Sequence, residues 1–210
     1  NCGSFTIKYV DSHVGAYPTI VTRTFTVTDA CGNNVTCVQT IEIEDTTNPT
    51  ISCPSNISKN ASYGSCSASV NWPLPVYADN CNVHSLTWSI TGDTNGSSLP
   101  NGINQMGSHS FNVGTSTVEF IVEDNAGNTT ICNFDVEVVD NQNPTISCPS
   151  NVVDLADPGQ CSATGVSLGT PFTGDNCSVA NVTHSPMEPY NVGTTNVVWI
   201  VTDASGNTAS

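Results

Sequence analysis

Hydrophobic and polar residues alternate with a period of two in several segments of the chain. Residues 118–123 read Val-Glu-Phe-Ile-Val-Glu, residues 134–138 read Phe-Asp-Val-Glu-Val, and residues 22–27 read Thr-Arg-Thr-Phe-Thr-Val. Successive side chains of a strand point to opposite faces, so this period predicts half-buried β-strands. No stretch of helical length carries an apolar stripe at helical spacing. The pattern therefore predicts an all-β protein built from many short strands.

One turn recurs between the alternating segments. It occurs as Asp29–Asn33, Asp124–Asn128 and Asp203–Asn207, and in each copy Asp opens the turn, Gly is fourth and Asn is fifth. The Asp side chain can accept hydrogen bonds from backbone N–H groups, and Gly can adopt the positive φ that closes a hairpin. We therefore expect a hairpin at each site, and about 80–95 residues per unit is typical of an immunoglobulin-like sandwich.

A longer repeat contains these hairpins. Residues 48–56, Asn-Pro-Thr-Ile-Ser-Cys-Pro-Ser-Asn, recur at 143–151. We expect the C-terminal part of a first repeat in residues 1–46, a complete second repeat in 47–140, and a third repeat in 141–210 that is truncated at its last strand. This frame suggests a fragment of a longer chain. A tandem array indicates a spacer or scaffold before it indicates an enzyme.

The second repeat is longer than the third in one place. Residues 92–107, which are rich in Gly, Ser and Asn, have no counterpart after Cys177. This insertion is expected to be a long loop or an added hairpin. Loops on rigid scaffolds often bind ligands, but surface insertions are also tolerated without any role.

Composition limits the class of protein. The chain has three Lys and Arg residues against 18 Asp and Glu, a net charge of −15, which argues against nucleic acid or an anionic membrane as a partner. Ten cysteines at repeating positions favour disulfides formed in an oxidising compartment. Zinc is disfavoured because the four His residues do not repeat with the cysteines. No apolar segment of membrane length is present.

The ordered motifs resemble the hyalin repeat (HYR) domain family. They are Asn-Pro-Thr-Ile-x-Cys-Pro, Asp-Asn-Cys, Val-Gly-Thr-x-x-Val, Asp-x-x-Gly-Asn-x-x-x-Cys and Val-x-Val-x-Asp, and they cover nearly the whole chain. The resemblance implies an immunoglobulin-like fold in long extracellular adhesive or structural proteins. The first repeat is similar to a variant from giant surface proteins of Bacteroidota, including gliding and adhesion filaments exported by the type IX route. Eukaryotic matrix proteins carry related repeats.

The resemblance also implies a disulfide pairing, in which Cys53 pairs with Cys132. Cys66 is then expected to pair with Cys81, and Cys161 with Cys177. The extra Cys31 in the first turn is expected to pair with Cys2. This scheme leaves Cys37 and Cys148 without partners.

The two linkers between repeats are the best candidate sites. They contain acids and Asn residues beside a Pro, an arrangement that resembles the calcium-stiffened junctions of cadherins. Calcium takes six to eight oxygen ligands. The candidate ligands are Glu44, Asp45 and Asn48 in the first linker and Asp140, Asn141 and Asn143 in the second, with Asp79 or Asp124 adding more from nearby loops. The alternative is a polar turn with capping side chains.

Other signals are weaker. Seven Asn-x-Ser/Thr sites occur at about the chance frequency: Asn34, Asn56, Asn60, Asn95, Asn128, Asn176 and Asn181. Thr46 lies in a pattern similar to that of Bacteroidota O-glycosylation. Trp72, Trp88 and Trp199 are expected in the core rather than on a sugar-binding face. No catalytic constellation is visible.

These observations favour a non-enzymatic segment of a long extracellular filament or adhesin stalk that acts as a rigid spacer or fibre body. No cofactor is required, although calcium fits the linkers. The partners would be neighbouring repeats, with self-association or surface glycans and proteins as further options. The alternatives are an adhesion module that binds a glycan or protein through residues 92–107, and an accessory domain of a secreted enzyme.

Overall fold

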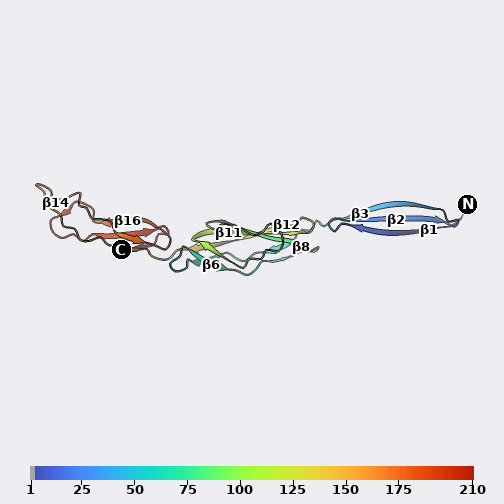
Figure 1. Cartoon of the computed structure of the whole chain (residues 1–210), viewed down its shortest axis with the longest axis horizontal. Coiled ribbons are helices and arrows are strands. Elements are labelled where there is room, and N and C mark those ends of the chain that lie inside the picture. The colour runs from blue at the N-terminus through green and yellow to red at the C-terminus, as the bar shows by residue number, and fades with distance from the viewer. Residues whose placement is uncertain (1–2) are drawn as a thin grey trace.

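The computed structural model describes residues 3–210, and within that range the chain consists of strands and turns with no helix. Consequently, no described segment forms an apolar helix long enough to span a membrane. The strands form three bodies that follow one another along a line, with the two ends of the array far apart (Figure 1). The predicted all-β, tandem immunoglobulin-like architecture is confirmed.

The first body is a single antiparallel sheet in the order β1-β2-β3. Its strands are β1 (Phe5–Val14), β2 (Thr19–Asp29) and β3 (Asn34–Ile43). No second sheet covers this one within the described residues, so Tyr9 and Val38 remain more than half exposed. The guanidinium of Arg23 donates two hydrogen bonds of 2.8 Å to the Asp11 carboxylate and lies 4.3 Å from the centre of the Tyr9 ring.

The second body is a two-layered sandwich. One layer is a five-stranded sheet in the order β5-β12-β11-β8-β9, and the strands that face it form the pairs β4–β7 and β6–β10. The bounds are β4 (Thr50–Ser52), β5 (Ile57–Asn60), β6 (Ser67–Asn71), β7 (Val76–Ala78), β8 (Val83–Gly92), β9 (Gly96–Ser97), β10 (Ser108–Asn112), β11 (Gly114–Asp124) and β12 (Thr129–Val139).

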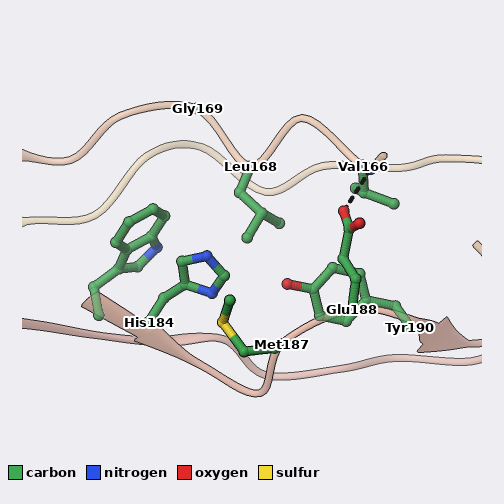
Figure 2. Close-up of a pocket in the computed structure, with 8 residues that line it drawn as sticks. Val166, Leu168, Gly169, His184, Met187, Glu188 and Tyr190 are labelled. Carbon is green, nitrogen blue, oxygen red and sulfur yellow. Dashed lines mark hydrogen bonds between the residues drawn. The ribbon is translucent and has the colours of Figure 1, made fainter. Parts of the chain in front are cut away.

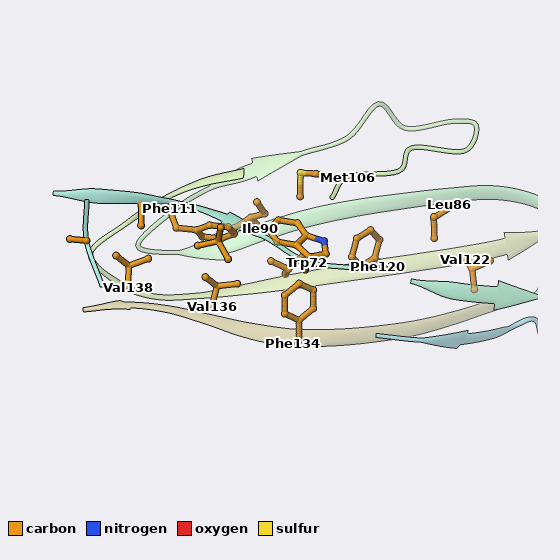
Figure 3. Close-up of a cluster of buried hydrophobic side chains, with 14 residues drawn as sticks. Trp72, Leu86, Ile90, Met106, Phe111, Phe120, Val122, Phe134, Val136 and Val138 are labelled. Atoms are coloured by element: carbon orange, nitrogen blue, oxygen red, sulfur yellow. The ribbon is translucent and has the colours of Figure 1, made fainter. Parts of the chain in front are cut away.

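The core of the sandwich lies between these layers (Figure 3). In β11 every second side chain is buried, as its period predicted, and Phe120 has no exposed surface. Trp72 approaches from the opposite layer and packs edge-on against Phe134, with ring centroids 5.5 Å apart. Trp72 is therefore a core residue, as expected, and Trp88 packs against the same cluster.

The third body repeats the strand pairing of the second. Its pairs β13–β15 and β14–β17 correspond to β4–β7 and β6–β10, and its sheet β16-β18-β19 corresponds to β8-β11-β12. The bounds are β13 (Thr145–Ser147), β14 (Ser162–Ala163), β15 (Phe172–Gly174), β16 (Val179–Ser185), β17 (Tyr190–Asn191), β18 (Val198–Asp203) and β19 (Thr208–Ala209). Among the aliphatic and aromatic side chains of its described residues, prolines aside, only Val201 is buried.

The insertion at residues 92–107 folds back onto the sandwich. Its short strand β9 pairs with β8, the Leu86 N–H donates to the Gly102 carbonyl, and the Asn104 N–H donates to the Leu86 carbonyl. Thr94 and Met106 are buried. The insertion therefore covers the edge of β8, and a covered edge cannot pair with another chain.

Candidate functional site at the junctions between repeats

The first junction is organised around Asp45, which lies in the linker between β3 and β4. Its Oδ1 accepts hydrogen bonds from the Thr47 N–H at 3.0 Å and from Asn80 Nδ2 at 3.3 Å. These contacts, led by the Thr47 bond, lower the pKa of Asp45. Its Oδ2 is buried and accepts no hydrogen bond. The linker carboxylate is thus held by its own turn on one side and by the next repeat on the other.

Two further carboxylates meet Asp45 from the second repeat. Asp79 follows β7, and its Oδ2 accepts the Cys81 N–H at 2.7 Å while its Oδ1 is buried without a partner. Asp124 opens the β11–β12 turn and is 1% exposed. One oxygen of each of the three carboxylates lies within 4.8 Å of the other two.

The role of Asp124 explains the recurring turn in the sequence. Its Oδ1 accepts the N–H groups of Ala126 and Asn128, and its Oδ2 accepts Asn128 Nδ2 at 2.8 Å. Burial disfavours the charged form, but these hydrogen bonds outweigh it and lower the pKa of Asp124. Asn128 Nδ2 also donates to the Asp45 carbonyl at 3.1 Å. The turn therefore fixes the linker to the end of the sandwich.

The second junction has the same construction. Asp140 takes the place of Asp45, and its Oδ1 accepts the Gln142 N–H and Asn176 Nδ2, both at 3.1 Å. Asp175 takes the place of Asp79, and its Oδ2 accepts the Cys177 N–H at 2.8 Å. Asn207 Nδ2 donates to the Asp140 carbonyl at 3.1 Å. As at the first junction, Asp140 Oδ2 and Asp175 Oδ1 are buried without a partner.

Further contacts tie the second repeat to the linker and to the third repeat. Gln142 accepts the Gly64 N–H at 2.7 Å and donates to the Ser62 carbonyl at 3.1 Å. Asn176 Nδ2 donates to the Ser65 carbonyl at 3.2 Å. At the first junction, the Tyr17 hydroxyl donates to the Cys81 carbonyl at 2.8 Å. At the second junction the loop of the second repeat thus contacts both the linker and the third repeat, and at the first junction Tyr17 contacts the following repeat.

A disulfide also crosses the second junction. Cys66 of the second repeat is bonded to Cys177 of the third, so the predicted pairs Cys66–Cys81 and Cys161–Cys177 are wrong. The reason is that Cys66 lies against the following repeat, to which it is bonded, whereas Cys81 lies against the preceding body, where the Tyr17 hydroxyl donates to its carbonyl. Cys81 and Cys161 are free thiols.

The remaining cysteines follow the predicted scheme where the structure describes them. Cys53 is bonded to Cys132, the predicted pair, and this bridge joins β12 to the chain just after β4. Cys37 and Cys148 are free and exposed. Cys31 is disulfide-bonded, and Cys2, its predicted partner, lies outside the described residues.

Only some of the candidate calcium ligands lie in the carboxylate clusters at the junctions. Asp45 and Asp140 lie inside the carboxylate clusters, and Asp79 and Asp124 join the first cluster from their loops. Glu44, Asn48, Asn141 and Asn143 are exposed. Sequence reasoning missed Asp175, although the repeated Asp-Asn-Cys motif was the available signal, because Asp175 matches Asp79 in that motif.

Two of the candidate glycosylation sites belong to the junctions. The side-chain nitrogens of Asn128 and Asn176 donate hydrogen bonds to the linker aspartates and are partly buried. A glycan on either nitrogen would remove these bonds. The other five sites, and Thr46, do not take part in the junction hydrogen bonds between the described residues.

The third repeat contains a hollow of about 380 Å³ (Figure 2). The Glu188 carboxylate accepts the N–H groups of Gly165 and Val166 at its rim. The His184 ring lies 4.8 Å from the Trp199 ring, and its Nδ1 is buried without a partner. The lining consists of Val166, Leu168, Gly169, His184, Met187, Glu188, Tyr190 and Trp199.

This hollow corresponds to the packed core of the second repeat. Trp199 pairs with His184 across the sheet as Phe120 pairs with Trp88, and Leu168 occupies the position of Trp72. The hollow therefore lies between the layers of the third repeat, at the place where the second repeat has its packed core.

Comparison with protein families identifies the repeats. The family model described as HYR domain matches residues 44–108, 104–138 and 139–210. A protein named hyalin from Strongylocentrotus purpuratus is 35% identical over 195 residues, which cover 89% of this chain and 15% of that protein. Hyalin from Lytechinus variegatus is 34% identical over 149 residues, which cover 69% of this chain and 25% of that protein.

The chain thus spans a quarter or less of the length of these two relatives. Among solved structures, extracellular cadherin domains 1–4 of protocadherin gamma B7 align with 98% of this chain and 59% of theirs. The sequence identity is 14% and the TM-score is 0.36.

Proposed function

Because the chain belongs to the HYR domain family, we propose that it is a rigid, extended spacer within an extracellular protein that takes part in adhesion. HYR and immunoglobulin-like domains are structural or adhesive rather than enzymatic, and the disulfides fit an oxidising, extracellular setting. The observation that carries the proposal is the Cys66–Cys177 disulfide, because a covalent bond between consecutive repeats limits their relative motion.

The junction hydrogen bonds support the same function. Short linkers that contain a buried Pro, Pro49 or Pro144, leave little slack between repeats. Each linker aspartate is held by an Asn from the following repeat, Asn80 or Asn176. In a longer array of this repeat, Cys161 would pair with the counterpart of Cys177 in the next repeat, and Cys81 with the counterpart of Cys66 in the preceding one.

Small-angle X-ray scattering of the full chain tests this proposal. If the chain is a rigid spacer, scattering measured under oxidising conditions should give a single elongated particle with the length of the array in Figure 1. The Cys66→Ser variant should show a broader distance distribution, because the second junction then rests on hydrogen bonds alone. A compact particle, or a broad distribution for the oxidised wild type, would exclude a rigid spacer.

An adhesion module is the second candidate, and one observation favours it. Leu99 at the tip of the insertion is 73% exposed although the rest of the insertion is fixed to β8. An exposed apolar side chain on a rigid loop suits a contact with another surface. If residues 92–107 bind a partner, Leu99→Ser will weaken attachment of chain-coated beads to isolated extracellular matrix. Equal attachment of wild-type and Leu99→Ser beads would leave the spacer as the one supported function. Self-association into filaments is a second form of this proposal. It is what the resemblance of the first repeat to Bacteroidota surface proteins implies.

A further inference from the structure

The sheet of the first body has two unlike faces. Tyr9 pairs with Phe25 on the next strand and Phe25 pairs with Cys37 on the one after, so these three side chains form a row across one face. The apolar side chains that share this face include Phe5, Ile7, Val27, Val35, Ile41 and Ile43. The opposite face consists mainly of Thr and other polar residues. The face with the row, here called the apolar face, is therefore built like the inner face of a sandwich.

The corresponding face of the second repeat is buried. There Phe120 and Cys132 pair across β11 and β12 as Phe25 and Cys37 pair across β2 and β3. Phe120 has no exposed surface, and Cys132 is bonded across the sandwich with 5.8 Å between the two Cα atoms. In the first body no second sheet within residues 3–210 lies over the apolar face, so Tyr9 is 59% exposed and Cys37 is an exposed free thiol. An exposed apolar face of this kind marks an interaction surface.

The charge on the apolar face allows a second copy of the chain to bind there. The chain has a net charge of −15, so most surfaces of two copies repel each other. On this face, however, Arg23 donates two hydrogen bonds to the Asp11 carboxylate and neutralises it. Asp29, at the end of the face, is hydrogen-bonded within its own turn. Two copies can therefore approach without unpaired carboxylates at the centre of the contact.

The position of the first body also favours a second copy. It forms one end of the array, and its strands run along the array (Figure 1). Two apolar faces can therefore pack with antiparallel strands while the rest of each chain extends away in opposite directions. A two-fold axis along the row then places Tyr9, Phe25 and Cys37 each opposite its own copy. Because Cys132 bridges two layers from the equivalent position, a disulfide between the two Cys37 residues fits this arrangement.

The size of the apolar face sets the strength of the contact. Three strands about 4.8 Å apart, with about ten residues each at a rise of about 3.3 Å per residue, present about 500 Å². Two such faces bury about 1,000 Å² in total, which is the lower limit for a specific interface. Packing alone is therefore weak and reversible, and a covalent bond is needed to make the pair permanent.

We propose that two copies of the chain pair through the apolar faces of their first bodies and are then joined by a disulfide between their Cys37 residues. The oxidant is a low-molecular-weight disulfide such as oxidised glutathione. The Cys37 thiolate of one copy attacks it and releases one molecule of reduced glutathione, and the Cys37 thiolate of the second copy displaces the other. Two thiols are thus oxidised to one disulfide while one glutathione disulfide is reduced to two thiols.

Pairing through the first body gives an end-to-end assembly. The two arrays share their first bodies at the centre and carry their third repeats at the two far ends, so the pair is nearly twice as long as one chain. This inference does not rest on the spacer function, because a flexible chain could pair through the same face.

Oxidation of the full chain in a glutathione redox buffer is the test. At about 100 μM chain, which saturates a complex of micromolar dissociation constant, non-reducing mass spectrometry should show a covalent dimer. Its peptide map should contain Cys37 joined to Cys37 and should retain the bonds Cys53–Cys132 and Cys66–Cys177. Cys37→Ser should abolish the covalent dimer. Cys148→Ser is the control, because Cys148 is also exposed and free, and it should leave the dimer unchanged.

A second pair of variants tests the face itself. Ile7 lies on the apolar face and is 59% exposed, whereas Val10 lies on the opposite face of the same strand and is 72% exposed. Ile7→Glu should lower the yield of covalent dimer about tenfold or more, because it places an unpaired carboxylate in the contact. Val10→Glu adds the same charge outside the contact and should keep the wild-type yield. Both side chains are exposed in the single chain, so neither substitution should change the melting temperature.

Scattering separates this inference from the spacer function. Cys37→Ser keeps the Cys66–Cys177 disulfide, so it gives the length and rigidity of the single chain, against which the nearly doubled length of the wild-type dimer is measured. A flexible Cys37→Ser chain would remove the spacer and leave the pairing. The pairing is overturned by a monomeric wild type that carries only glutathione adducts, or by a dimer linked through Cys148. It is also overturned by equal yields from Ile7→Glu and Val10→Glu, or by a dimer no longer than one chain.

Discussion

Cys66 and Cys177 are bonded to each other although 111 positions separate them and they belong to consecutive repeats. Cys66 lies in the loop that precedes β6, and Cys177 follows Asn176, whose side chain donates a hydrogen bond to the linker residue Asp140. The covalent bond and the polar contacts therefore meet at one place. The second junction is a cross-linked joint rather than a free hinge.

Replacing Cys66 with Ser tests this joint. The substitution should leave Cys177 as a thiol that reacts with iodoacetamide, and a non-reducing peptide map should lose the Cys66–Cys177 peptide while retaining Cys53–Cys132. We expect the free energy of unfolding to fall by about 2–4 kcal/mol, because the bridge restrains the unfolded chain.

Cys161→Ser is the control for that experiment, since Cys161 is exposed and free and occupies the position in the third repeat that Cys66 has in the second. It should change neither the map nor the stability. A non-reducing peptide map of the wild type in which Cys66 is joined to Cys81 would contradict the disulfide between the second and third repeats.

The second repeat should depend on its aromatic core. Phe120 is fully buried between the two layers, so Phe120→Ala should reduce the free energy of unfolding of this repeat by about 3–5 kcal/mol. Ile131 lies on the neighbouring strand and is 55% exposed, so Ile131→Ala should cost less than about 1 kcal/mol. Urea denaturation followed by Trp fluorescence measures both. Equal losses would mean that the sandwich does not bury Phe120 as described.

The strands could be predicted because their signal is local. The alternation around Phe120 matches the buried and exposed faces of β11, and the Asp124 turn matches its own hydrogen bonds. The path of the Cys66 loop has no such local signal. The spacing of Cys66, Cys81, Cys161 and Cys177 is the same whether pairs form within a repeat or between repeats, and only the tertiary structure separates the two.

The candidate site was predictable in part for the same reason. Asp45 and Asp140 stand out because linkers are visible as breaks between repeats. The Asp-Asn-Cys motif marks Asp175 as the match of Asp79, but only the fold shows that the loop carrying it lies beside Asp140. The insertion was likewise predictable in part. Its composition predicts a long loop or an added hairpin, and β8 and β9 form the hairpin, but composition does not show that Thr94 and Met106 are buried against the sandwich.

The insertion should loosen when its internal hydrogen bonds are removed. Asn104 Nδ2 donates to the carbonyls of Leu99, Asn101 and Gly102, at 3.1, 2.9 and 3.2 Å. Asn104→Ala should therefore increase the rate of proteolytic cleavage within residues 98–104 severalfold, with little change in the melting temperature. Asn101→Ala is the control, because the Asn101 side chain makes no hydrogen bond with another described residue. Equal cleavage rates in the two variants would show that Asn104 does not hold the loop.

Acid should weaken the hairpin turns at Asp124 and Asp203. Burial raises the pKa of each carboxyl, but hydrogen bonds from Asn128 or Asn207 and from the backbone outweigh burial, so the pKa of each is lowered in the folded protein. A carboxyl whose pKa is lowered by folding stabilises the protein above its unfolded pKa, which is about 3.9 for Asp. That stabilisation is lost as the pH falls from this value toward the folded pKa.

The acid dependence can be assigned to one carboxyl by substitution. In the wild type, the free energy of unfolding should fall as the pH decreases below about 5, by at most about 1.4 kcal/mol per pH unit for each such carboxyl. Asp124→Asn should be less stable than the wild type at neutral pH, and the difference should shrink on acidification because the wild type loses the same contribution. Glu42→Gln, an exposed carboxyl outside the turns, should keep the wild-type profile. Urea denaturation at a series of pH values measures the three profiles, and a constant difference between Asp124→Asn and the wild type would refute the assignment.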